Sequence, residues 1–186
     1  MPSTLPPPRP DLASALLDYR RRWPGEGATI DLFDALLAEG AAAFARERAA
    51  GHFTASAWLV ASEGARVLLT HHRKLGLWLQ LGGHADGDSN LVRAALAEAR
   101  EESGLDALAI DPAIFDLDRH WIPEHKGVPA HWHYDVRYVV RATGSEAFTV
   151  SDESHALAWR EIAALVDDES ADASLRRMSR KWLGLA

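Results

Sequence analysis

Hydrophobic and polar positions along the chain follow two periods, one typical of helices and one typical of strands. Apolar residues recur at helical spacing in two N-terminal segments, and alternating runs follow them. The patterns predict helices over residues 11–22, 29–49, 89–103, 160–166 and 171–184. They predict strands over residues 52–61, 66–71, 114–122 and 132–142, with shorter candidates at 77–81 and 148–150. The first two strands are expected to form a hairpin, because the turn residues Glu63 and Gly64 lie between them.

The order of these elements favours an α/β fold with a mixed sheet, since a helix stands between two groups of strands and helices follow the second. Three parts are expected: a Pro-rich disordered tail over residues 1–10, a helical extension over residues 11–50 and the main domain over residues 51–186. The extension could cover a sheet edge, cap a substrate cleft or mediate a homodimer, and the sequence leaves these roles open.

The predicted helix over residues 89–103 has an unusual distribution of charge. An apolar stripe runs along it, formed by Leu91, Val92, Ala95, Leu96 and Ala99. Glu98, Glu101 and Glu102 flank this stripe at spacings that make them neighbours, and no basic residue stands three or four positions away to compensate them. We expect Asp88 or Ser89 to cap its start and Gly104 to end it. An acidic helix face with oxygen ligands alone predicts a site for a hard cation such as Mg²⁺.

Composition narrows the class of protein. The 186 residues are 47% hydrophobic and include seven Trp, which supports a packed core. A net charge of −7 argues against DNA or RNA as the main partner. The absence of Cys excludes disulfides, thiolate catalysis and Cys-based zinc sites. Neither an apolar run of ~20 residues nor a secretory signal pattern is found, so we expect a cytoplasmic protein that does not enter a membrane.

The segment GGHADGDSNLVRAALAEAREESGL, residues 82–105, resembles the Nudix box, GX5EX7REUXEEXGU, in which U is a bulky aliphatic residue. The matching positions are Gly83, Glu98, Glu101, Glu102, Gly104 and Leu105. Ser89 and Ala97 stand where the family has Glu and Arg, and Ala99 is a small substitute for the aliphatic residue. The family's Glu and Arg are understood to pair and brace the loop against the helix, so both partners of that brace are missing together. The resemblance covers roughly residues 52–166.

The resemblance implies a Nudix-like α/β/α sandwich with a mixed sheet, in which residues 51–186 are the catalytic domain. It implies a hydrolase that cleaves the pyrophosphate linkage of a nucleoside diphosphate derivative, such as a nucleotide sugar or a nucleoside triphosphate, with Mg²⁺ or alternatively Mn²⁺. Glu98 and Glu102 would be the main metal ligands, with Glu101 binding directly or through water and the Gly83 carbonyl as a further ligand. The matching position for the general base is Glu153, and its main competitors are Glu101 and Glu102.

Several polar residues outside the box are candidates for substrate binding. His131, His133, Asp135 and Arg137 share one face of the strand over 132–142. This pattern suits a metal site, hydrogen bonds to a phosphate or base, or an ordinary solvated face; His133 and Asp135 are the stronger candidates because they lie deeper in the strand. Arg73 and Lys74 form a basic turn that could meet a substrate phosphate or simply be solvated. His84 follows Gly83 directly and would lie beside the box metal.

Two other functions compete with the hydrolase. A nucleotide-sensing or regulatory protein on the same fold is favoured by the missing charges at Ser89 and Ala97, although the three glutamates count against it. An isomerase related to isopentenyl-diphosphate isomerase is a weaker alternative, because such enzymes normally use a catalytic Cys and this chain has none.

Overall fold

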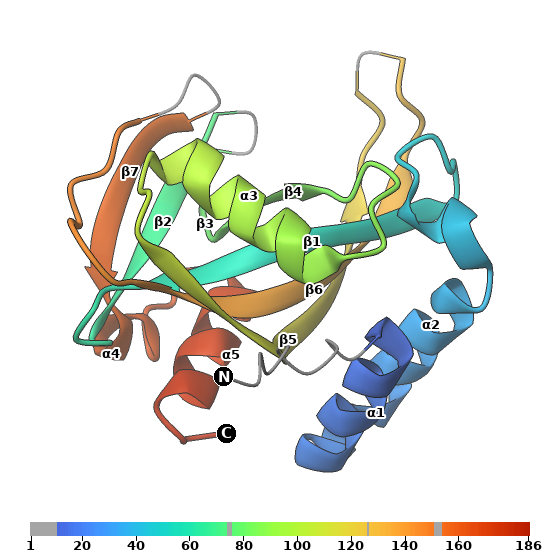
Figure 1. Ribbon diagram of the computed structural model, residues 1–186, viewed down its shortest axis with the longest axis horizontal. Coiled ribbons are helices and arrows are strands. Elements are labelled where there is room, and N and C mark those ends of the chain that lie inside the picture. Colours follow the sequence, from blue (N-terminus) through green and yellow to red (C-terminus); the bar gives the residue numbers. More distant parts are fainter. Residues whose placement is uncertain (1–10, 74–75, 126, 151–153) are drawn as a thin grey trace, which may run out of the picture.

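A computed structural model describes residues 11–73, 76–125, 127–150 and 154–186 (Figure 1). The helices are α1 (Leu12–Arg22), α2 (Gly27–Leu37), α3 (Leu91–Ser103), α4 (Ile162–Leu165) and α5 (Ala173–Trp182), with 3-10 turns η1 (Pro24–Glu26) and η2 (Gly40–Phe44). The strands are β1 (Gly51–Val60), β2 (Arg66–His72), β3 (Trp78–Leu79), β4 (Leu81–His84), β5 (Leu108–Ile122), β6 (His131–Ala142) and β7 (Ser154–Glu161). The predicted tail over residues 1–10 lies outside the described residues.

The strands form one curled, mixed sheet with the order β3-β2-β1-β6-β5, in which β4 also pairs with β1 and β7 with β2. β1 and β6 run parallel and the other pairs run antiparallel. In Figure 1, α3 crosses in front of β1 and β4, α1 and α2 lie at the right, and α4 and α5 lie at the lower left. The expected α/β fold with a mixed sheet and preceding N-terminal helices is therefore confirmed.

β1 is buried along its whole length and separates the hydrophobic clusters. Successive side chains of a strand point to opposite faces. On one face, Phe53 and Ala55 pack with the N-terminal helices and with the start of α3, and Leu59 packs with the end of α3. On the other face, Trp58 packs against α4 and α5. The central strand thus carries one helix layer on each side, as in a three-layer sandwich.

The N-terminal helices belong to the same hydrophobic core as the sheet. Phe33 of α2 is fully buried, and its ring lies 6.1 Å from that of Phe53 and 5.4 Å from that of Tyr134. Tyr19 of α1 donates a hydrogen bond to Glu26 over 2.5 Å and is also fully buried. Residues 11–50 therefore cover the sheet near β1 and β5 instead of standing apart from it, while the division of the chain into separate domains stays a prediction.

The structure differs from the sequence predictions in several local features. The single helix predicted over residues 29–49 ends at Leu37, because Gly40 adopts a positive φ of 73° and a 3-10 turn follows. Residues 148–150 form no strand, and the helix predicted from residue 160 begins at Ile162. The β1–β2 hairpin is paired only at Val60 and Val67, since β2 turns away to pair with β7 and β3.

The ends of α3 show one correct and one wrong prediction. Asn90, not Asp88 or Ser89, caps the start, because its side chain accepts a hydrogen bond from the Arg93 amide over 3.0 Å. Gly104 ends the helix in the left-handed conformation at φ 69°, as predicted. In the described part of the chain, every helix is too short or too polar to cross a bilayer.

Candidate active site

Two glutamates of helix α3, Glu98 and Glu102, lie against the two glycines of β4, Gly83 and Gly82. The Gly82 amide donates a 2.7 Å hydrogen bond to Oε1 of Glu102, whose side chain is almost buried. A Cβ at Gly83 would overlap the carboxylate of Glu98, and one at Gly82 would overlap Ser56 of β1. The close approach of α3 to β4 therefore requires glycine at position 83, and the close approach of β1 to β4 requires it at position 82. It places the Glu98 and Glu102 carboxylates beside consecutive residues of one strand.

Glu101 is arranged differently from the other two glutamates. It is exposed on α3, whereas Glu98 is half-buried and Glu102 is 9% exposed. Within the described chain, the one group of three or more His, Asp or Glu side chains whose ligand atoms lie within 4.8 Å does not include these glutamates. The structure thus brings Glu98 and Glu102 to the glycine strand and leaves Glu101 at the surface.

The carboxylates at this position fit a hard divalent cation. Carboxylate and carbonyl oxygens are the ligands that Mg²⁺ prefers. Because Gly83 has no Cβ, the Glu98 carboxylate lies directly against the strand backbone at this position. Together with Glu102, held in place by the Gly82 amide, this donor set suits Mg²⁺ or Mn²⁺.

Two ion pairs hold the loop between β4 and α3. Arg46, which precedes β1, forms a bidentate pair with Asp86, and the nitrogen Nε of Arg93 lies 2.7 Å from Oδ2 of Asp88. The hydrogen bond with Asp86 raises the pKa of Arg46, and the charge of Glu98 adds to this effect. The loop is therefore anchored from both sides, although Ser89 and Ala97 carry no charge. Sequence reasoning did not identify Arg46, since it lies far from the box along the chain.

The polar face of β6 is buried, so its interpretation as an ordinary solvated face is wrong. Asp135 is 1% exposed and accepts hydrogen bonds from Thr54 (3.0 Å), Ser56 (2.8 Å), Gln80 (3.2 Å) and Nε of Arg137 (2.8 Å). The parallel pairing of β1 with β6 explains this contact, because Thr54 lies opposite Asp135 in the register. The Asp135 carboxylate fixes the two strands and Gln80 to one another.

A cluster of imidazoles lies at the end of this face. The ring of His133 lies 5.0 Å from the rings of His52 and His131, 5.1 Å from His84 and 5.4 Å from His120, measured between centroids. The pKa of His133 is lowered to about 2, mainly by burial. The charges of the neighbouring histidines, His120, His84, His52 and His131, lower it further. The pKa of His52 is lowered to about 4, mainly by burial and then by the charges of His84 and His131. The backbone of Arg48 opposes this shift. Both rings are therefore neutral at pH 7.

The remaining candidates fall in three places. His84 is half-buried in β4 beside the imidazole cluster. Arg73 is exposed in the turn that follows β2. Lys74 and Glu153 lie outside the described residues. His52 had no recognisable signal in the sequence, because His131 and His133, its neighbours from β6, come about eighty residues later along the chain.

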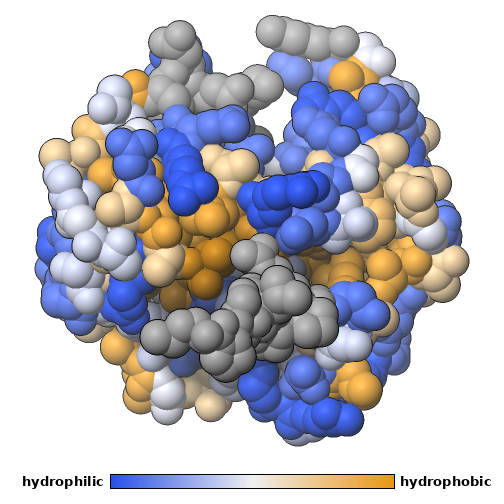
Figure 2. Space-filling view, in the orientation of Figure 1, coloured by the Kyte–Doolittle hydropathy of each residue, from blue (hydrophilic) through white to orange (hydrophobic). Residues whose placement is uncertain are grey.

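Figure 2 shows the α3 face of the molecule, where polar side chains (blue) surround recessed apolar areas (orange). A curled mixed sheet, a glutamate-bearing helix and a Gly-Gly strand beside its carboxylates define an α/β protein with two acidic side chains at a glycine strand. Residues 51–182 match the NUDIX domain family, and the chain belongs to this family. The match begins where the N-terminal helices end. No curated protein matches the chain.

Solved structures share this fold at low sequence identity. A Caenorhabditis elegans Ap4A hydrolase in a binary complex superposes with a TM-score of 0.56 at 19% identity, covering 71% of this chain and 95% of that one. A NUDIX family hydrolase from Clostridium perfringens gives a TM-score of 0.56 at 24% identity, covering 72% and 97%. The Escherichia coli dihydroneopterin triphosphate pyrophosphohydrolase gives 0.56 at 18% identity, covering 72% and 96%. These similarities establish the fold.

Proposed function

We propose that this protein is a metal-dependent pyrophosphohydrolase that cleaves the pyrophosphate linkage of a nucleoside diphosphate derivative, such as a nucleotide sugar or a nucleoside triphosphate. The observation that carries the proposal is the placement of Glu98 and Glu102 against Gly83 and Gly82. Family membership and the structural similarity to proteins named as an Ap4A hydrolase and a dihydroneopterin triphosphate pyrophosphohydrolase support it.

In the proposed site, Glu98, Glu102 and the Gly83 carbonyl hold Mg²⁺ or Mn²⁺, with Glu101 as a direct or water-mediated ligand. A bound divalent ion neutralises charge on the pyrophosphate oxygens, which lowers the barrier to attack by water. The Gly82 amide keeps the Glu102 carboxylate in one orientation, so little reorganisation is needed when substrate binds. The two ion pairs of the loop between β4 and α3, Arg46–Asp86 and Arg93–Asp88, would help to hold Gly83 in place beside α3.

The proton of the attacking water needs an acceptor. We assign this role to Glu153, with Glu101 and Glu102 as the alternatives. Glu101 is exposed and able to reach solvent, whereas Glu102 already accepts the Gly82 amide. Glu153→Gln and Glu101→Gln separate these assignments, because loss of the general base removes the acidic limb of the pH–rate profile.

Roles in substrate binding are proposed for Arg73, Lys74, His84, His133 and Asp135, by direct contact or by positioning. Arg73 and Lys74 would meet the phosphates through charge-assisted hydrogen bonds. His84 follows Gly83 in β4 and lies within the box segment itself. Asp135 is already engaged by four protein donors, so its part would be to hold β6 and Gln80 in place rather than to contact the substrate directly.

A substrate screen tests the proposed reaction. Nucleoside triphosphates, nucleotide sugars, ADP-ribose and dinucleoside polyphosphates are incubated with Mg²⁺ and phosphate products are measured. Glu102→Gln keeps an oxygen for the Gly82 amide but removes the charge, so we expect kcat/KM to fall at least about 100-fold. The matched control is Glu169→Gln, at an exposed position in the turn before α5.

The same screen separates the hydrolase from a nucleotide-sensing protein. A sensor would bind one of the compounds with micromolar affinity and release no product. Wild-type protein that turns over none of them would contradict the proposed reaction, and equal activity of Glu102→Gln and Glu169→Gln would contradict the assigned site.

A further inference from the structure

We propose that His52, His131 and His133 form a second metal site, which binds one divalent transition-metal ion and suits zinc best. This site is separate from the box glutamates and does not depend on the proposed hydrolysis. Within the described residues, these three side chains form the one group of at least three His, Asp or Glu residues whose ligand atoms all lie within 4.8 Å of one another.

The spacing of the nitrogen atoms already approaches that of a metal site. Nε2 of His131 lies 3.1 Å from Nε2 of His133. Zinc binds imidazole nitrogen at about 2.0–2.1 Å in a tetrahedron, which places two ligand nitrogens about 3.3 Å apart. The third ring, His52, lies 5.1 Å from His131 and 5.0 Å from His133 between centroids. The ligand atoms of the three side chains lie within 4.8 Å of one another, so one ion placed between them would be within reach of all three.

A hydrogen bond made by one ring nitrogen of His131 fixes which nitrogen carries the lone pair. Its Nδ1 donates a hydrogen bond to the carbonyl of Pro129 over 2.8 Å, because a carbonyl oxygen can only accept. In the neutral ring, the lone pair then stands on Nε2, the atom that faces His133. A histidine that binds a metal almost always donates its other ring N–H to a carbonyl or carboxylate in this way.

His52 supplies an independent observation that points to a ligand. It is 1% exposed on β1, and among the described residues neither of its ring nitrogens has a hydrogen-bond partner. The backbone of Arg48 approaches the ring, but not in hydrogen-bond geometry. Buried polar atoms without partners are unfavourable and uncommon in native proteins. Coordination of an ion by His52 would satisfy one of these nitrogens.

The imidazole site and the glutamate site lie on opposite faces of β4. A Cβ at Gly83 would point into the carboxylate of Glu98, whereas His84, the next residue, lies 5.2 Å from the ring of His52. Adjacent residues of a strand alternate between faces, so the two sites are distinct although one peptide bond joins them. Nitrogen ligands on one face favour Zn²⁺, Ni²⁺, Cu²⁺ or Fe²⁺, while oxygen ligands on the other favour Mg²⁺.

Three imidazoles leave a tetrahedral ion with one open position, as in zinc sites that bind water or a substrate group. Asp135, the nearest carboxylate along β6, is engaged by four protein donors and is therefore not assigned as the fourth ligand. The ring of His84 lies beside the cluster, at 5.1 Å from His133. The fourth position would be left for water or a small anion.

Metal binding is measured on the full chain without an affinity His tag. The protein is stripped with a chelator and titrated with Zn²⁺ against a chromophoric competitor, and Co²⁺ is used to record the visible spectrum of a tetrahedral site. We expect one ion per chain. His131→Gln and His133→Gln should each weaken Zn²⁺ binding at least about 100-fold, whereas His125→Gln, at an exposed position, should not.

His52→Leu gives a test in which the variant is expected to stay folded. Because the substitution removes two buried, unpaired nitrogens, we expect the melting temperature of the metal-free protein to rise, while the further rise that Zn²⁺ causes in wild type disappears. Wild-type protein that binds no ion, or His131→Gln and His133→Gln proteins that bind Zn²⁺ as tightly as wild type, would overturn the proposal. So would a His52→Leu protein that keeps the full Zn²⁺-induced rise.

The glutamate variants keep this test apart from the proposed hydrolysis. Glu102→Gln should bind Zn²⁺ at the imidazole site as wild type does. A protein that binds Zn²⁺ through the three histidines and hydrolyses no pyrophosphate would refute the proposed function and support the imidazole site. A protein that hydrolyses pyrophosphate, and whose histidine variants keep full Zn²⁺ affinity, would support the proposed function and refute the imidazole site.

Discussion

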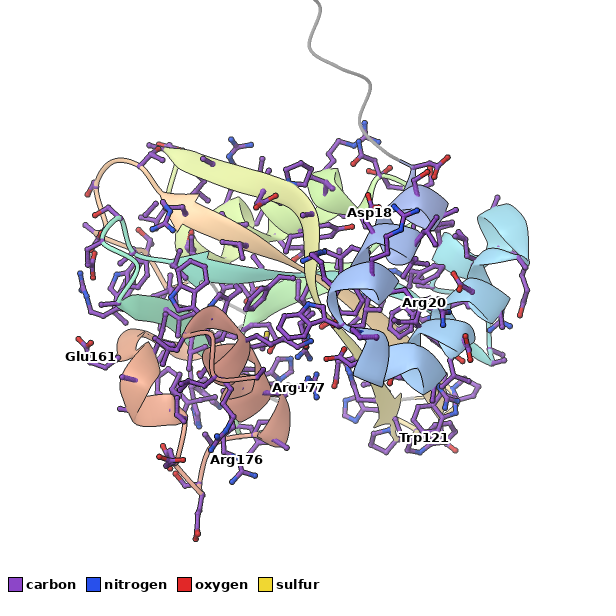
Figure 3. The ribbon with its side chains drawn as sticks, turned by 90° about the horizontal axis from the view of Figure 1, so that it is seen from below. Asp18, Arg20, Trp121, Glu161, Arg176 and Arg177 are labelled. Carbon is purple, nitrogen blue, oxygen red and sulfur yellow. The ribbon has the colours of Figure 1, made fainter. Side chains whose placement is uncertain are left out.

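Lys181, in the last helix, donates a hydrogen bond from Nζ to the hydroxyl of Tyr19, in the first helix, over 2.6 Å. The same nitrogen lies 2.7 Å from Oδ1 of Asp116 in β5. Arg177 of α5 reaches Asp116 from the same helix, and Figure 3 shows it on the side of α5 that faces the N-terminal helices. Buried charges therefore tie residues near both ends of the chain to β5, the edge strand of the sheet.

Asp116 is the carboxylate on which this network depends. It is fully buried and accepts hydrogen bonds from Arg177 and Lys181 at 2.7 Å and from Arg137 at 3.3 Å. Asp116→Asn keeps the shape but leaves these cations with less compensation, so we expect the free energy of unfolding to fall by about 3–5 kcal/mol. Urea unfolding measures this change. Asp106→Asn, at an exposed position, should change it by less than ~0.5 kcal/mol; equal effects of the two substitutions would contradict the role of the network.

Acid should unfold the protein through the same carboxylates. Burial alone raises the pKa of Asp116, but the hydrogen bond from Arg177 and the charges of Arg137 and Lys181 outweigh it, so the net pKa is lowered. For Asp118, burial is likewise outweighed, by the hydrogen bond from His120 and the charge of Arg137. Because the folded pKa lies below the unfolded value of about 3.9, their contribution is complete above that pH and is lost as the pH falls below it.

We therefore expect the free energy of unfolding to change little between about pH 7 and 5 and to fall steeply below about pH 4. Urea titrations across this range measure the slope. Asp116→Asn removes one of the two carboxylates, so its curve should be shallower in acid. Parallel curves for wild type and Asp116→Asn would show that acid sensitivity arises elsewhere.

Gly83→Ala tests the close approach of α3 to β4. A Cβ at this position overlaps the Glu98 carboxylate, so that side chain must move away from the strand. We expect hydrolysis to fall at least about 100-fold, since misplacing a catalytic group by about 1 Å has such an effect. Gly25→Ala is the control, because no atom lies within 4 Å of its added Cβ. Activity equal to that of Gly25→Ala would mean that Glu98 is not needed where the structure places it.

Phe33→Ala tests whether the N-terminal helices fold with the sheet. Its buried ring contacts Phe53 and Tyr134, so we expect a loss of about 3–5 kcal/mol and one unfolding transition. Leu32, one residue earlier, is 40% exposed, and Leu32→Ala should cost less than ~1 kcal/mol. Two separate transitions in wild type, with only the weaker one shifted in Phe33→Ala, would instead indicate an independent extension.

Local patterns in the sequence correctly predicted most of the elements and the helix of the box. α1, β1, β6 and α3 lie within a few residues of their predicted bounds, because hydrophobic periodicity is set by neighbouring residues. Gly104 ends α3 because only glycine adopts a positive φ at little cost. The family resemblance came from the spacing of residues within one segment, and the match over residues 51–182 confirms it.

Features that depend on distant segments were decided only by the tertiary structure. The sequence showed His131 and His133 on one face of a strand, but their third neighbour, His52, joins them through the parallel pairing of β1 with β6. The same register brings Thr54 and Ser56 to the buried carboxylate of Asp135. Strand pairing is set by the packing of the whole sheet, since the alternation of polar and apolar residues in one strand does not specify its partner. The sequence alone thus determined the glutamate helix and the family, and the assembled sheet decided which histidines meet.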